Sequence, residues 1–128
     1  MRLCAVVTLS SLMIATAYAV PPLETGVSLQ LAQWRAQQYR DPRYDLSLHL
    51  REGADSLTGR LRLQVTLKHK VDLVLDWRGK ALAGLRVNGA PAPIRVEKEH
   101  LVVPAKYLRT GKNILEVDFE ARVAVSGA

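Results

Sequence analysis

Three histidines, His49, His69 and His100, are the side chains of this 128-residue chain best suited to hold a metal or move a proton. A hydrolytic zinc site built on a helix needs two histidines one turn apart, with a glutamate between them to activate water. Here the histidines are 20 and 31 residues apart and fall on predicted strands or beside predicted turns. We therefore expect three surface histidines and no metal site.

The carboxylates and hydroxyls also lack a catalytic arrangement. Carboxylates gather in the turn 97–99 and on one face of the segment 116–120. We interpret them as solvent-exposed charges, because a general acid–base pair needs two carboxylates held in a cleft. No phosphate-binding glycine loop occurs. The strand hydroxyls have no histidine at triad spacing: Ser47, Ser56, Thr58 and Thr66. We predict no catalytic, cofactor-binding or metal-ligating residue, so the chain as it stands is not an enzyme.

The stretch from 44 to 68 predicts two long strands that would position any such residues. In 57–68 the odd positions are apolar or glycine and the even positions are polar, a strict period of two. Residues 51–56 supply turn chemistry. The same alternation occurs before the turn, at Tyr44, Leu46, Leu48 and Leu50. We expect a long antiparallel hairpin with one wet and one apolar face.

A short helix should precede this hairpin. Val27, Leu31 and Trp34 have helical spacing, with Ser28 as the N-cap, and the helix should reach Gln38. Pro42 is expected to end it, because the residue before a proline favours extended geometry. Trp34 is interpreted as a packing residue that covers an end of the sheet.

Further strands are predicted after the hairpin. Residues 71–77 should place Val71, Leu73, Leu75 and Trp77 on one side, and 82–87 should end in the Asn88-Gly89 turn. Two prolines in 90–93 keep the return irregular. A small hairpin and a long closing strand complete the set: 94–96, 101–103 and 115–123. Seven or so short strands predict an all-β, antiparallel sandwich or saddle-shaped pair of sheets.

The first 19 residues have the features of a secretory signal. Arg2 supplies a basic start, 5–15 an apolar core, and Ala17-Tyr18-Ala19 a small-x-small cleavage site. A membrane anchor is the weaker interpretation, since the run is short and carries hydroxyls. Cys4, the only cysteine, would leave with this segment. The mature chain would therefore lack disulfides and thiolates, which fits a bacterial periplasmic or extracellular location.

The charge distribution argues against nucleic acid as a partner. The formal net charge is +6, or +5 once Arg2 is removed, and the excess is spread along the chain. Only seven aromatic residues are present to interleave with it. A nucleic-acid-binding face would need a concentrated basic patch. We also expect no membrane association once the signal is cleaved.

The order of several short motifs resembles one family, the amino-terminal domain of zinc aminopeptidases of the aminopeptidase N type. The resemblance covers roughly 31–127 and rests on these segments: Arg43-Tyr-Asp-Leu-Ser-Leu-His-Leu50, Gly53-Ala-Asp55, Thr58-Gly-Arg60, Leu73-Val-Leu-Asp76, Val87-Asn-Gly89, Val103-Pro-Ala105, Leu108-Arg-Thr-Gly-Lys-Asn113 and Phe119-Glu-Ala121. It implies a β-rich, saddle-like domain that packs on a thermolysin-like catalytic domain and helps to wall the substrate chamber.

In such enzymes the catalytic domain binds zinc through a His-Glu-x-x-His helix and a downstream glutamate. The printed sequence contains neither that helix nor the catalytic domain, so no functional residue of the family is carried over. Zinc is accordingly expected only in the full-length enzyme, and peptide substrates only as indirect partners. The implied partner is the catalytic zinc-peptidase domain.

These observations divide the chain into a signal peptide (1–19), a lead-in with a short helix (20–42) and a β-sandwich domain (43–128). That domain is expected to be incomplete at its carboxyl end, with an unpaired sheet edge and part of the 115–123 face uncovered. Two functions remain open. One is the non-catalytic domain of an exported zinc aminopeptidase, and the other is a stand-alone exported module that binds peptides, glycans or proteins.

Overall fold

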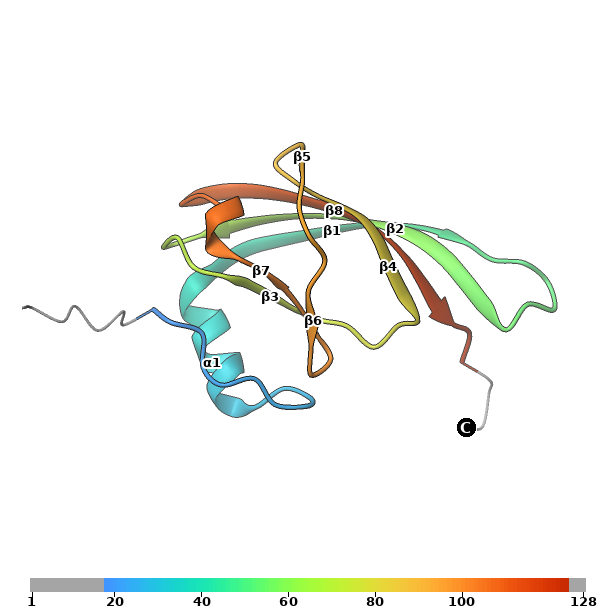
Figure 1. Ribbon diagram of the computed structural model, residues 1–128, viewed down its shortest axis with the longest axis horizontal. Helices are drawn as coiled ribbons and strands as arrows, with labels where there is room; N and C mark the ends of the chain where they lie inside the picture. The colour runs from blue at the N-terminus through green and yellow to red at the C-terminus, as the bar shows by residue number, and fades with distance from the viewer. Residues whose placement is uncertain (1–17, 125–128) are drawn as a thin grey trace, which may run out of the picture.

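The computed structural model describes residues 18–124, which form two antiparallel sheets and one helix (Figure 1). The large sheet has the strand order β1-β2-β8-β4-β5 and the small sheet the order β3-β7-β6. The elements are α1 (Leu29–Gln38), β1 (Tyr39–His49), β2 (Ser56–Leu67), β3 (Leu73–Asp76), β4 (Ala81–Val87), β5 (Ala90–Pro91), β6 (Val96–Glu97), β7 (His100–Val103), the 3-10 turn η1 (Ala105–Tyr107) and β8 (Gly111–Arg122).

This architecture confirms the predicted fold class, an antiparallel β-sandwich preceded by a short helix. The large sheet lies over the small sheet and α1, and it extends beyond them on the side of the β1–β2 turn (Figure 1). Most of the predicted signal peptide, residues 1–17, lies outside the described residues. Within residues 18–124 no helix is long and apolar enough to cross a membrane.

The helix begins as predicted but ends for a different reason. The Ser28 side-chain oxygen accepts a hydrogen bond from the Leu31 amide at 3.1 Å. The helix ends at Gln38, and Tyr39 is already extended and opens β1. Pro42 therefore does not end the helix. It lies within β1, where the pairing with β2 is irregular between Arg40 and Arg43, and an edge strand tolerates a proline there.

The predicted hairpin is confirmed as β1 and β2, and β8 pairs along the other side of β2. Opposite residues of β2 and β8 then point to the same face, so Leu63 lies across from Leu115. The main core is formed by apolar side chains of both sheets and of the η1–β8 connection: Leu63, Val65, Leu67, Leu73, Leu85, Val87, Leu101, Val103, Leu108, Leu115 and Val117.

The apolar residues of β1, and Leu50 just beyond its end, behave differently from those of β2. Tyr44, Leu46, Leu48 and Leu50 are 58%, 58%, 49% and 68% exposed, although the first three lie opposite residues of the inner, apolar face of β2. The reason is that β1 is an edge strand whose inner face the small sheet and α1 leave largely uncovered (Figure 1). We call this surface the β1 inner face (Tyr44, Leu46, Leu48 and Leu50).

The structure shows which part of the 115–123 face is covered. Leu115 and Val117 are buried, because β8 is a central strand between β2 and β4. Only Val123, beyond the end of β8, is exposed. Within residues 18–124, a long edge strand and a row of exposed apolar side chains are found together at β1.

Strand β3 is shorter than predicted and buries both of its faces. Leu73 enters the main core, whereas Val74 joins a second cluster with Leu31, Trp34 and Val71. The alternation predicted Val71 and Leu73 on the same side, but they belong to different clusters. The reason is that β3 begins only at Leu73, so Val71 is not part of the strand. The buried Trp34 confirms the interpretation of this residue as a packing residue.

The predicted turns are present. Asn88 and Gly89 have φ values of 51° and 83° and join β4 to the two-residue β5. Lys98 and Glu99 have φ values of 46° and 66° and join β6 to β7. Two successive residues with positive φ match the right-handed twist of a tight hairpin.

Candidate functional site

The structure keeps the three histidines apart. His49 is exposed at the end of β1, on the outer face of the large sheet. The ring of His69 stacks on Tyr18, with 3.8 Å between centroids, and its Nδ1 lies 3.0 Å from Gln38 Oε1. Across the described range, 18–124, no group of three or more histidine, cysteine, aspartate or glutamate residues is placed to hold a metal ion.

His100 is not the surface residue that the sequence predicted, because it is only 1% exposed. It is the first residue of β7 and lies directly opposite Asp76 of β3. Its Nδ1 is 3.1 Å from Asp76 Oδ1, and its Nε2 is 3.0 Å from the carbonyl oxygen of Glu24. The position of His100 beside a predicted turn indicated that its side chain would be exposed. In the structure the lead-in before α1 folds back over the His100 ring.

Both partners of His100 are hydrogen-bond acceptors. The Asp76 carboxylate and the Glu24 carbonyl oxygen thus hold the ring at its two nitrogens. Asp76 in turn accepts hydrogen bonds from Arg35 of α1 at 2.7 and 3.3 Å. These hydrogen bonds, aided by the charges of Arg35 and His100, lower the pKa of Asp76, while partial burial opposes the shift. The His100 cluster (Glu24, Arg35, Asp76 and His100) thus ties the lead-in and α1 to the small sheet.

The outer face of the large sheet carries a shallow hollow of about 630 Å³. Ser47, His49 and Asp118 line it, which are the residue types of a catalytic triad. However, the Asp118 carboxylate is engaged by Arg60, with contacts of 2.7 and 3.3 Å. Lys80 similarly holds Glu120 at 2.8 Å. No hydrogen-bonded relay of hydroxyl, imidazole and carboxylate is formed here.

These ion pairs hold the carboxylates in their charged form. The hydrogen bond from Arg60 lowers the pKa of Asp118, and the hydrogen bond from Lys80 lowers the pKa of Glu120. The same contact with Asp118 raises the pKa of Arg60. A general acid needs the opposite shift, towards neutrality. Asp118 and Glu120 are therefore ion-paired carboxylates on a solvent-exposed face.

The inner side of the sheet presents an apolar surface instead. An apolar hollow of about 240 Å³ lies between α1, β1, β2 and β3, and Ala36, Tyr44 and Leu75 are among the residues that line it. Tyr44 also begins the β1 inner face, which continues along the strand to Leu50. The alternation in the sequence showed which side chains share this face, but only the sheet order revealed that they stay exposed.

The comparisons with known proteins agree with this fold. No family model matches the chain, and no curated protein matches it. Among solved structures it is similar to an M1 zinc metallopeptidase from Deinococcus radiodurans, with 22% identity and a TM-score of 0.57 over 70% of this chain. A mutant of that enzyme bound to a Tyr-Ser-Ala substrate gives 21% identity, the same TM-score and the same coverage. A two-domain M1 zinc metallopeptidase mutant bound to L-arginine gives 21% identity and a TM-score of 0.57 over 72% of this chain.

The chain spans only 22% of the length of each of these structures. At this identity the likeness concerns the fold, and it agrees with an amino-terminal domain of the M1 metallopeptidases. The resemblance predicted from the order of the motifs is thereby confirmed at the level of architecture. The members of that class are zinc metallopeptidases, whereas residues 18–124 of this chain form a β-sandwich without a metal-binding cluster.

Proposed function

We propose that this chain is the non-catalytic amino-terminal β domain of an exported zinc aminopeptidase. In the full-length enzyme it would pack on the zinc-peptidase domain and form one wall of the substrate chamber. The observation that carries the proposal is the fold match to a part of the M1 zinc metallopeptidases, and the resemblance of the chain's motifs to the aminopeptidase N type supports it.

The chemistry of the described residues supports a structural role. The carboxylates on the outer face are ion-paired, and the one buried histidine is held by two acceptors within the domain. Peptide hydrolysis would then come from the companion domain, with its zinc and its water-activating glutamate. This chain would supply shape and surface, and it would meet peptide substrates only indirectly.

The proposal includes export through the amino-terminal signal. Cleavage after Ala19 would remove the Tyr18 ring from His69 and the hydrogen bond from Trp34 Nε1 to the Tyr18 carbonyl. Val20 and Leu23 would still pack against the cluster that contains Trp34. The helix therefore keeps its apolar cover in a mature chain that begins at Val20. Sequencing the amino terminus of the protein released by the producing cell tests this step directly.

The decisive experiment follows the coding sequence past codon 128. A reading frame that continues into a His-Glu-x-x-His helix and a downstream glutamate supports the proposal. The encoded protein should then release amino acids from aminoacyl anilides, and a zinc chelator should abolish that activity. A frame that ends there, with no neighbouring gene for such a helix, contradicts the proposal and favours the stand-alone binding module.

A further inference from the structure

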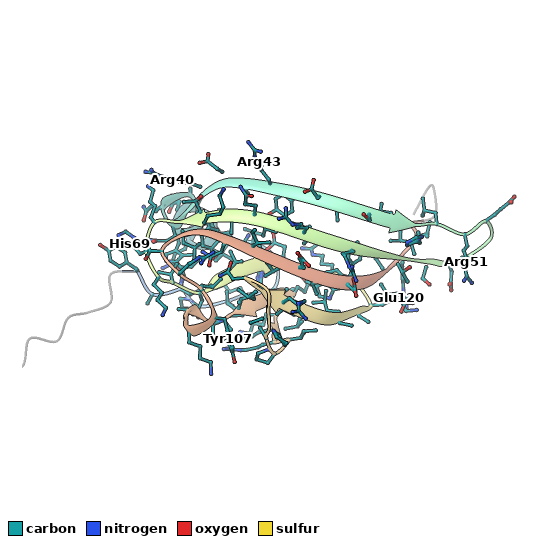
Figure 2. All side chains as sticks on the ribbon, turned by 90° about the horizontal axis from the view of Figure 1, so that it is seen from above. Arg40, Arg43, Arg51, His69, Tyr107 and Glu120 are labelled. Carbon is teal, nitrogen blue, oxygen red and sulfur yellow. The ribbon has the colours of Figure 1, made fainter. Side chains whose placement is uncertain are left out.

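Among residues 18–124, strand β1 has a neighbouring strand on one side only. It contains 11 residues, is hydrogen-bonded to β2 on one side only, and forms the end of the large sheet. Figure 2 shows Arg40 and Arg43 projecting from this edge, with Arg51 in the turn beyond its far end. Unpaired backbone N–H and C=O groups on such an edge are a template for another strand.

We propose that β1 pairs with β1 of a second copy of this chain, antiparallel about a two-fold axis that passes through Ser47. In this register the residue numbers of opposite partners add to 94. Ser47 then lies opposite its own copy, and Asp45 lies opposite His49. On the inner face Leu46 lies opposite Leu48, and Tyr44 lies opposite Leu50.

The distribution of residues along β1 selects this register. The four exposed apolar side chains are spaced symmetrically about Ser47, so each finds an apolar partner in the second copy. Moving the axis to Leu46 would place Leu50 opposite Pro42, which has no N–H to donate. Moving it to Leu48 would place Tyr44 opposite the charged Glu52.

Charge on the outer face selects the same register. With the axis at Ser47, the Asp45 carboxylate of each copy faces the His49 ring of the other. With the axis at Asp45, two carboxylates would lie directly opposite each other, and like charges in that position are destabilising. Leu50 and Arg51 both lie beyond His49, the last residue of β1, so their pairings with Tyr44 and Arg43 fall at the ends of the ladder. The like charges of Arg43 and Arg51 there oppose the register, whereas the Asp45–His49 pairs inside the strand favour it.

The apolar hollow beside β1 adds a second point of contact. Tyr44 lines this hollow, together with side chains of α1 and β3. In the proposed register Leu50 of the second copy is the partner of Tyr44 and lies at the margin of the hollow. Pairing would thus cover Leu50, the most exposed residue of the β1 inner face. This inference does not depend on the proposed enzymatic context.

A cysteine cross-link tests the register, with Cys4 replaced by serine in every variant. Ser47→Cys places two thiols directly opposite each other, where antiparallel partners have Cα atoms about 4.5–5.5 Å apart, within disulfide range. Mild oxidation should therefore link most of the chains as dimers. Asp45→Cys is the matched control on the same face, because its two copies would be offset by four residues, or about 13 Å. An equal yield from both variants would overturn the register.

The association itself is measured by light scattering coupled to size-exclusion chromatography of the purified chain. We expect a mass twice that of one chain, which falls to the mass of one chain on dilution. Ser47→Lys should abolish the dimer, since it places two ammonium groups in opposition. Gln64→Lys, one strand further in, should leave the dimer intact. A native chain that stays monomeric at high concentration and forms no Ser47→Cys cross-link overturns the proposal and leaves the edge to a strand of another protein.

Discussion

The ring of Phe119 lies directly against Gly59, its partner across β2 and β8. A Cβ atom added to Gly59 would lie 2.5 Å from Phe119 Cζ and 2.8 Å from the carbonyl oxygen of Ser47. The rings of Phe119 and Trp77 meet edge-on, with 5.9 Å between their centroids. A glycine in mid-strand thus lets an aromatic side chain cover the inner face where the small sheet no longer reaches.

Gly59→Ala should therefore destabilise the domain by about 1–3 kcal/mol, as overpacked sites in cores do. The Ser47 carbonyl belongs to the backbone and has little freedom to move away. Urea unfolding followed by tryptophan fluorescence measures the change. Thr58→Ala, at the adjacent position on the outer face, should change stability by no more than about 0.5 kcal/mol. Equal midpoints for the two variants would contradict the close contact.

Leu63→Asp should unfold the domain. Leu63 is 1% exposed in the middle of β2, and a carboxylate buried there has no partner. Thermal unfolding followed by circular dichroism should show the loss of the cooperative transition.

Arg62→Gln is the matched control for that variant, one residue along the same strand. Arg62 lies on the outer face, 3.9 Å from Asp45 and 3.7 Å from Glu116. Glutamine removes the charge of Arg62 without adding a third carboxylate beside these two. Exposed ion pairs of this kind contribute about 0–1 kcal/mol, and a small shift is expected. A loss as large as that of Leu63→Asp would mean that the two faces have been assigned in reverse.

Asp76 should make the stability of the domain sensitive to acid. The hydrogen bonds from Arg35 lower its pKa in the folded state below the ordinary value of about 3.9. Its contribution to stability is then fully present above pH 4 and is lost as the pH falls through the lowered value. Melting temperatures of the native chain and of Asp76→Asn should therefore differ at pH 6 and converge towards pH 3. A gap that stays constant over this range would show that the Arg35 contact contributes nothing to folding.

The purified chain should bind no zinc in stoichiometric amount and release no amino acid from aminoacyl anilides. The motive is the wide separation of the histidines, with His100 already held by Asp76 and the Glu24 carbonyl. Metal analysis after dialysis, together with a chromogenic assay, measures both quantities. One tightly held zinc ion per chain would contradict the prediction that these residues form no metal site.

The architecture was largely determined by local sequence. Period-two alternation, the Asn88-Gly89 turn and the Ser28 cap are effects of neighbouring residues, and each predicted element with such a signal is present. The order of the motifs likewise pointed to the correct fold. The sequence alone also indicated the wet face of β2, because its polar residues recur at every second position.

Tertiary structure decided which of the predicted faces are covered. Leu46 and Leu115 both sit in alternating strands, but Leu46 lies on an edge and is exposed, whereas Leu115 lies in a central strand and is buried. His100 is buried because the lead-in, 76 residues earlier in the chain, folds over it. Burial depends on contacts between distant segments, and the periodicity of one segment contains no information about what packs against it.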